Sequence, residues 1–69
     1  MVEIFKTNIQ RKKLANLIID RLSSHYPFFK INIDMKDSDR VLRIEGNYIS
    51  CDEIVKRLQS LNIKCQVLE

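Results

Sequence analysis

The sequence predicts an α+β fold in which a four-stranded sheet packs against two helices. Four short segments alternate apolar and polar residues, as strands do, and two longer segments repeat their apolar residues at helical spacing. Their order along the 69 residues is strand, helix, strand, strand, helix, strand. The chain has one Gly and one Pro, which leaves little room for long loops.

The first strand and the first helix are predicted from the N-terminal third. Residues 2–6 alternate except at Phe5, which indicates a strand with Phe5 turned to the face opposite its apolar neighbours. A helix is predicted over residues 9–24, with Asn8 as its N-cap. Pro27 disfavours helical backbone at the residue before it and so ends this helix. The helix has one apolar stripe, formed by Leu14, Ala15, Leu17, Ile18, Ile19 and Leu22.

Residues 29–35 and 40–45 are predicted to form an antiparallel hairpin, since only a short polar turn separates them. In the second of these strands Leu42 and Ile44 face one way and Val41, Arg43 and Glu45 the other. In the first strand of the hairpin one face carries Phe29, Ile31, Ile33 and Met35.

The C-terminal third predicts a helix over residues 51–61 and a last strand over 64–68. Ser50 followed three residues later by Glu53 is typical of a capping box, and Asn62 is a suitable residue to end the helix. Cys65 alternates with Val67, which places both on the inward face of the last strand.

This order of elements is that of a ferredoxin-like βαββαβ two-layer sandwich, predicted as a single domain over residues 1–69. Right-handed crossovers place both helices on one face of the four-stranded antiparallel sheet. We expect the first and third strands in the centre and the other face of the sheet open.

Composition excludes several classes of protein. No apolar run is long enough to cross a membrane, and Glu3 stands where a signal peptide would be positively charged. We therefore expect a cytoplasmic protein without a membrane partner. Cys51 and Cys65 form no C-x-x-C motif and are expected to be reduced thiols, and we expect no cofactor and no metal.

The frame resembles the heavy-metal-associated domain of copper chaperones and metal-pumping ATPases. In that family a Met-x-Cys-x-x-Cys motif follows the first strand and its thiolates hold a soft metal such as Cu(I). At those two cysteine positions this sequence has Asn8 and Arg11. A guanidinium offers no lone pair to a metal, so the resemblance implies a domain of this kind whose metal motif is absent. The segment 61–63 lies where many members have a Leu-Gly-Tyr loop beside the metal.

The positive charge indicates a candidate binding surface. The net charge is +3, and the whole excess lies in residues 1–24. Cations at a helix start oppose the helix dipole, whereas the free N–H groups there attract anions. We expect a binding surface at the start of the first helix and on the open sheet face near Phe5; its other residues are Lys6, Asn8, Arg11, Lys12 and Lys13.

The predicted function is a non-enzymatic binding domain for a protein partner or for its own copy. One alternative is binding of an anion or nucleic acid through the same cations, although the third strand offers no aromatic residue for base stacking. Another is soft-metal handling through Cys51 or Cys65. Catalysis as in acylphosphatases, which share the topology, would need a glycine-rich loop after the first strand, and residues 6–11 contain no glycine.

Overall fold

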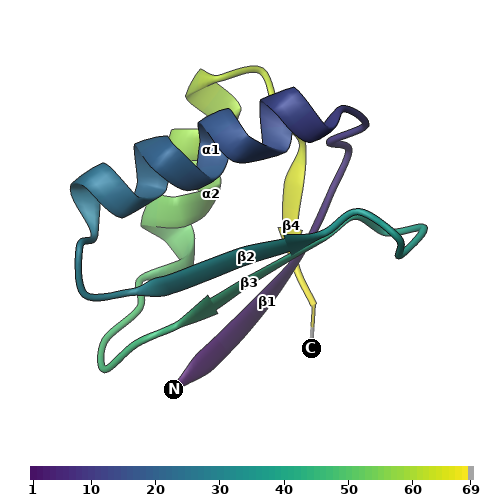
Figure 1. Ribbon diagram of the computed structural model, residues 1–69. Coiled ribbons are helices and arrows are strands. Elements are labelled where there is room, and N and C mark those ends of the chain that lie inside the picture. Colours follow the sequence, from purple (N-terminus) through teal and green to yellow (C-terminus); the bar gives the residue numbers. More distant parts are fainter. Residues whose placement is uncertain (69) are drawn as a thin grey trace.

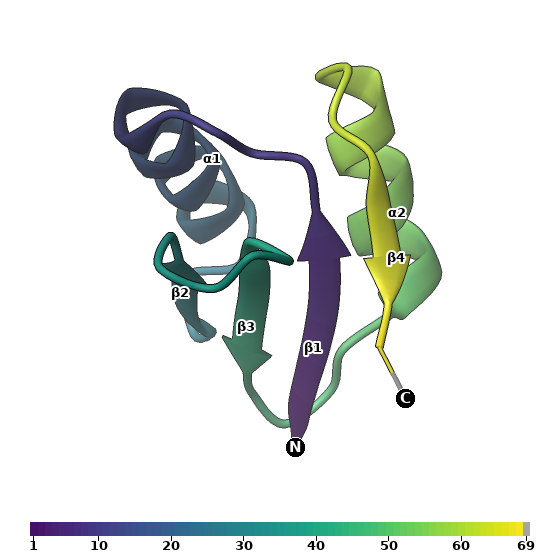
Figure 2. The same cartoon turned by 90° about the vertical axis from the view of Figure 1, so that its right-hand side faces the viewer.

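Six elements build the fold in the computed structural model, which describes residues 1–68 (Figure 1). The predicted domain ends at Glu69, which lies outside the described residues. Both helices cover one face of the sheet and leave the other face open (Figures 1 and 2). This arrangement confirms the predicted ferredoxin-like α+β class. The elements are β1 (Val2–Thr7), α1 (Lys12–His25), β2 (Lys30–Asp34), β3 (Val41–Glu45), α2 (Cys51–Ser60) and β4 (Cys65–Val67).

The sheet has the order β2-β3-β1-β4, with every neighbouring pair antiparallel. The first and third strands are therefore central, as predicted. Phe5 lies opposite Leu42 on β3 and opposite Val67 on β4, so the register places these three side chains in one row. That row faces the helices, where α1 packs on β2 and α2 on β4.

The expectation that Phe5 lies on the open sheet face is wrong. Phe5 is fully buried, and its neighbour Ile4 takes the open face with 38% of its surface exposed. Ile4 and Phe5 are both apolar, so the local pattern does not decide which of the two faces the helices. The pairing of Phe5 with fully buried Leu42 decides between them. Most of the remaining core is aliphatic: Ile9, Ala15, Ile18, Leu22, Ile33, Ile44, Ile49, Ile54, Leu58 and Ile63.

The start of α1 also differs from the prediction. The helix begins at Lys12 rather than at residue 9, and Arg11 is the N-cap residue without a side-chain capping bond. Asn8 is not the N-cap, because its Oδ1 accepts a hydrogen bond of 3.0 Å from the Lys64 N–H. Asn8 thereby joins the β1–α1 loop to the α2–β4 loop.

Both ends of α2 follow the sequence signals. Ser50 Oγ accepts the Glu53 N–H at 3.4 Å, which confirms the N-cap. At the other end Asn62 has φ 62°, and the N–H groups of Asn62 and Ile63 donate to the carbonyls of Gln59 and Leu58. This is the Schellman pattern, in which Asn is one of the few residues that tolerate the left-handed position.

Thr7 fastens the end of β1 to the β2–β3 turn. Its buried Oγ1 donates to the Arg40 carbonyl at 2.6 Å, and its N–H donates to the Asp39 carbonyl at 3.0 Å. The same Oγ1 accepts the Ile9 N–H at 3.4 Å. Arg40 has a positive φ of 47°, and its guanidinium donates to the Met35 carbonyl. One hydroxyl thus holds a strand end and a turn in place.

Gly46 allows the aromatic ring of Phe29 to lie against the backbone after β3. A Cβ at Gly46 would lie 2.4 Å from Phe29 Cδ1, so no other residue fits without displacing the ring. The ring also stacks on Tyr26, with 4.9 Å between centroids and 8° between planes.

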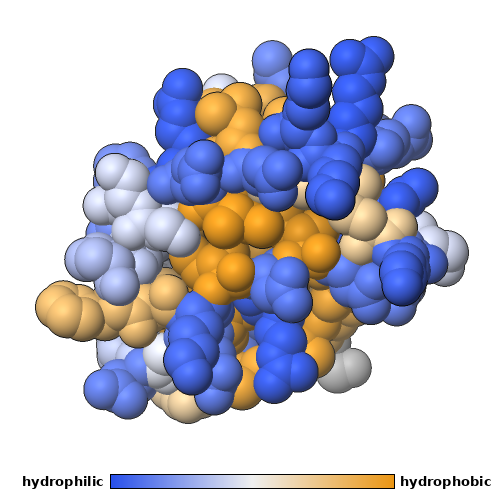
Figure 3. All heavy atoms as spheres, in the orientation of Figure 1, coloured by the Kyte–Doolittle hydropathy of each residue, from blue (hydrophilic) through white to orange (hydrophobic). Residues whose placement is uncertain are grey.

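Apolar side chains remain visible between α1 and the sheet on the side where β2 lies (Figure 3). Within residues 1–68, neither helix is both long and apolar enough to cross a membrane.

Candidate functional site

The start of α1 presents three cations to solvent. Arg11, Lys12 and Lys13 are all exposed, and no acidic residue lies in the first turn. The first N–H groups of a helix have no partner within the helix, and no side chain of the described residues caps them here. This end of α1 therefore combines positive side chains with the positive end of the helix dipole.

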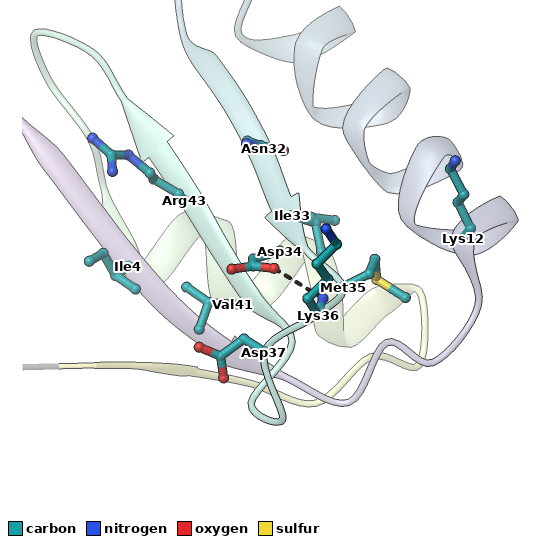
Figure 4. A pocket seen from close by; sticks show the side chains of 10 residues that line it. All are labelled: Ile4, Lys12, Asn32, Ile33, Asp34, Met35, Lys36, Asp37, Val41 and Arg43. Atoms are coloured by element: carbon teal, nitrogen blue, oxygen red, sulfur yellow. Dashed lines mark hydrogen bonds between the residues drawn. The ribbon is translucent and has the colours of Figure 1, made fainter.

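The three cations do not form one cluster. Arg11 and Lys13 line a shallow hollow of about 580 Å³ that also includes Asn8. Lys12 points to another side of the helix and lines the hollow around the end of β2 (Figure 4). The predicted set is thus divided by the turn of the helix.

Two further lysines lie on the other side of Asn8. Lys6 and Lys64 line a hollow of about 300 Å³ that shares Asn8 with the first hollow. Lys6 forms an ion pair of 3.6 Å with Asp39, and both side chains are largely exposed. We call the set Lys6, Asn8, Arg11, Lys13 and Lys64 the Asn8 surface.

Lys64 is the member of this surface that the sequence did not reveal. It lies more than fifty positions beyond Asn8, and the Asn8–Lys64 hydrogen bond brings the two loops together. A signal did exist, because the βαββαβ order places the loops after β1 and after α2 at the same end of the sheet.

The hollow around the end of β2 has a volume of about 760 Å³ and a mixed charge (Figure 4). Ile33 and Met35 line it from the side of α1, and Ile4 and Val41 line it from the open face of the sheet. Its carboxylates mainly order the turn: Asp34 Oδ1 accepts the Lys36 N–H at 3.0 Å, and Asp37 Oδ1 accepts the Asp39 N–H at 2.8 Å.

The cysteines are free thiols, as predicted. Burial raises the pKa of Cys65 to about 11, with a smaller effect from the charge of Cys51. The pKa of Cys51 is also raised, first by burial and then by the carboxylates of Glu3 and Asp52, and this disfavours the thiolate form. Within residues 1–68, no three His, Cys, Asp or Glu side chains gather closely enough to hold a metal ion.

A polar group between the helices was missed by the sequence reasoning. Tyr26 OH donates to Glu53 Oε1 at 2.5 Å, and Arg57 Nε donates to Tyr26 OH at 2.9 Å. Arg57 also lies over the Tyr26 ring, 5.4 Å from its centroid, and pairs with Glu53 at 3.4 Å. Glu53 followed by Arg57 one helical turn later was the available signal, but nothing local pointed to Tyr26. This group links α1 to α2 and serves the fold.

The open sheet face carries a narrow apolar strip along β1. Val2, Ile4 and Leu68 are exposed there, and the Leu68 N–H donates to the Ile4 carbonyl at 2.8 Å. Arg43 lies directly opposite Ile4 on β3. Because Phe5 is in the core, the described parts of β1 and β3 present no aromatic ring on this face.

Comparisons of the chain with family models, curated proteins and solved structures found no match.

Proposed function

We propose that this chain is a non-enzymatic binding domain whose Asn8 surface engages an acidic face of a protein partner. The observation that carries the proposal is the gathering of Lys6, Arg11, Lys13 and Lys64 around Asn8. Within residues 1–68, only Lys6 of these four cations has an ion-pair partner. Unpaired exposed cations on one side of a domain attract acidic surfaces and speed their association.

The shape of the surface favours a broad partner over a small substrate. Two shallow hollows meet at Asn8, and each charged residue that lines them is a cation. Arginine has no lone pair with which to accept a proton, so these groups fit the binding of carboxylates better than general base catalysis.

The relation to heavy-metal-associated domains stays a prediction. At the position of the first family cysteine, the side-chain oxygen Oδ1 of Asn8 accepts a hydrogen bond from the Lys64 N–H. At the second position Arg11 is the N-cap residue of α1. We propose that the loop binds carboxylates in place of a metal, since both residues suit an anion better than a soft cation.

Charge reversal tests the proposal. The probe is a fluorescein-labelled poly-glutamate peptide, titrated by fluorescence anisotropy against the wild type and against Arg11→Glu combined with Lys13→Glu. The control, Arg21→Glu with Lys56→Glu, changes the net charge equally at two exposed residues outside the Asn8 surface. We expect binding to be lost in the first variant and retained in the control. If peptide binding were weakened equally in both variants, the effect would come from net charge alone, and a specific binding surface would be rejected.

The alternatives are separate outcomes of parallel titrations. Preference for a single-stranded RNA over the peptide, with a steep dependence of affinity on salt, would favour nucleic-acid binding. The absence of an aromatic ring on the described open faces of β1 and β3 weighs against it. Stoichiometric Cu(I) binding that Cys65→Ser abolishes would favour metal handling, which the raised pKa of Cys65 disfavours.

A further inference from the structure

Strand β2 forms an edge of the sheet and, within residues 1–68, pairs only with β3 (Figure 2). Its five residues are Lys30, Ile31, Asn32, Ile33 and Asp34. When a second copy of this strand runs antiparallel to the first, with Asn32 opposite Asn32, each isoleucine lies opposite an isoleucine and Lys30 lies opposite Asp34. The strand is therefore complementary to an antiparallel copy of itself.

The register of the sheet shows which backbone groups of β2 face outward. The Gly46 N–H donates to the Met1 carbonyl, and these two residues continue the register of β1 and β3 by one position, as a pair of the hydrogen-bonded kind. Hydrogen-bonded and non-hydrogen-bonded pairs alternate in an antiparallel ladder. It follows that Ile44 and Leu42 turn their backbone groups toward β1. The alternate residues of β3, which are Val41, Arg43 and Glu45, turn theirs toward β2.

The partners of those residues on β2 are Lys30, Asn32 and Asp34. The N–H and C=O groups of Ile31 and Ile33 consequently point away from the sheet, along its free edge. Such an edge is a template for another strand.

We propose that β2 pairs antiparallel with β2 of a second copy, centred on Asn32, and joins the two sheets into one across a two-fold axis. In this register Ile31 of one copy exchanges both main-chain hydrogen bonds with Ile33 of the second copy, so every outward group of the strand is satisfied. Sliding one strand by two residues would break this correspondence and place Lys30 opposite Asn32 or opposite Lys36, depending on the direction.

Charge complementarity favours a second copy of this chain as the partner of β2. Lys30 and Asp34 have no ion-pair partner within residues 1–68. In the centred register Lys30 meets Asp34 of the second copy in non-hydrogen-bonded pairs, where opposing side chains lie closest. Two-fold symmetry repeats this ion pair at both ends of the paired strands.

An apolar area beside the edge formed by β2 supports the same dimer interface. Apolar atoms are exposed between α1 and β2 on the side of the molecule where β2 is the edge (Figure 3). Ile31 and Met35 are only partly buried against the core there. Ile19 is also partly buried. It lies seven residues beyond Lys12 and therefore on the same side of α1, which faces the hollow around the end of β2. Pairing of β2 would bring α1 of each copy alongside and cover this area.

The opposite edge does not offer the same pairing. Strand β4 has three residues, Cys65 to Val67, and no charged side chain within it. The proposal therefore predicts a closed dimer rather than a chain of copies, because only one edge of each sheet is self-complementary.

Charge exchange at the edge tests the dimer. Sedimentation equilibrium should show a wild-type dimer at high protein concentration. Lys30→Asp and Asp34→Lys should each raise the dissociation constant at least about tenfold, since both cross-strand ion pairs become repulsive. An equimolar mixture of the two variants should restore dimers, as should both changes in one chain. Circular dichroism verifies that each variant is folded.

A wild type that stays monomeric would overturn the proposal, whether or not another protein supplies a strand to this edge. Single variants that dimerise as strongly as the wild type would overturn it equally.

A disulfide tests the register. In a Cys51→Ser, Cys65→Ser background, Asn32→Cys should cross-link rapidly on oxidation, because opposed residues of a non-hydrogen-bonded pair have Cα atoms about 4.5 Å apart. Gln66→Cys, which is exposed on the open face of the opposite edge strand, is the matched control and should not cross-link. Equal cross-linking at both positions, or dimers without cross-linking at position 32, would reject the centred register.

Discussion

We expect the replacement of Gly46 by alanine to destabilise the protein, which is the reverse of the usual effect of a Gly→Ala change. Gly46 has no positive φ, so alanine would normally stabilise by about 0.4–1 kcal/mol through the unfolded chain. Here the new Cβ would lie 2.4 Å from Cδ1 and 2.7 Å from Cε1 of the Phe29 ring. The ring cannot withdraw freely, because it packs against the core and stacks on Tyr26.

We expect Gly46→Ala to lower the free energy of unfolding by about 1–3 kcal/mol, the usual cost of overpacking. For a domain of this size, each kcal/mol lowers the Tm by about 4–8 °C. Urea unfolding followed by far-UV circular dichroism measures the change. In a Phe29→Ala background the same substitution should be neutral or stabilising, so a double-mutant cycle should give a coupling energy of at least about 1 kcal/mol.

Two results would refute the reasoning. One is a Gly46→Ala variant as stable as the wild type. The other is an equal loss in both backgrounds, because the cost would then come from the backbone of Gly46 rather than from its contact with Phe29.

Three further predictions concern local interactions. Asn62→Ala should cost about 1 kcal/mol because alanine is strained at φ 62°, whereas Asn62→Gly should match or exceed the wild type in urea unfolding; equal values would contradict this. Thr7→Val keeps the shape of the side chain but leaves the Arg40 carbonyl without its donor, and should cost about 1–3 kcal/mol in thermal unfolding, more than Thr7→Ser. The hydrogen bond from Tyr26 lowers the pKa of Glu53, so this contribution is present above the ordinary carboxyl pKa and is lost as the pH falls through the lower folded value. Between about pH 7 and about pH 3 the wild type should therefore lose more stability than Glu53→Gln, and parallel pH profiles would argue against the bond.

The fold class and most element positions could be predicted because they depend on local patterns. Alternation fixed the inward faces of Leu42 and Ile44, and both are fully buried. The Ser50 cap and the Asn62 ending depend on residues within one turn of the helix, and both were found.

The errors arise where a distant partner decides. Asn8 has the side chain of an N-cap, but it bonds to Lys64 at the far end of the chain, and α1 begins later. Which of Ile4 and Phe5 faces the core depends on the pairing of β1 with β3. For the candidate site, the cations of the first helix were identified from the sequence, but their division and the addition of Lys64 required the assembled sheet.

The central position of β1 has a consequence for folding. It pairs with β3 on one side and with β4, the last strand, on the other. Closing β1 on β4 encloses almost the whole described chain, whereas β2 and β3 are joined by a short turn, so the loop-closure entropy is largest for β4. We expect β4 to join last and to exchange its amide hydrogens first. A destabilised chain would then release β4 before the rest of the sheet and expose the backbone of its most central strand.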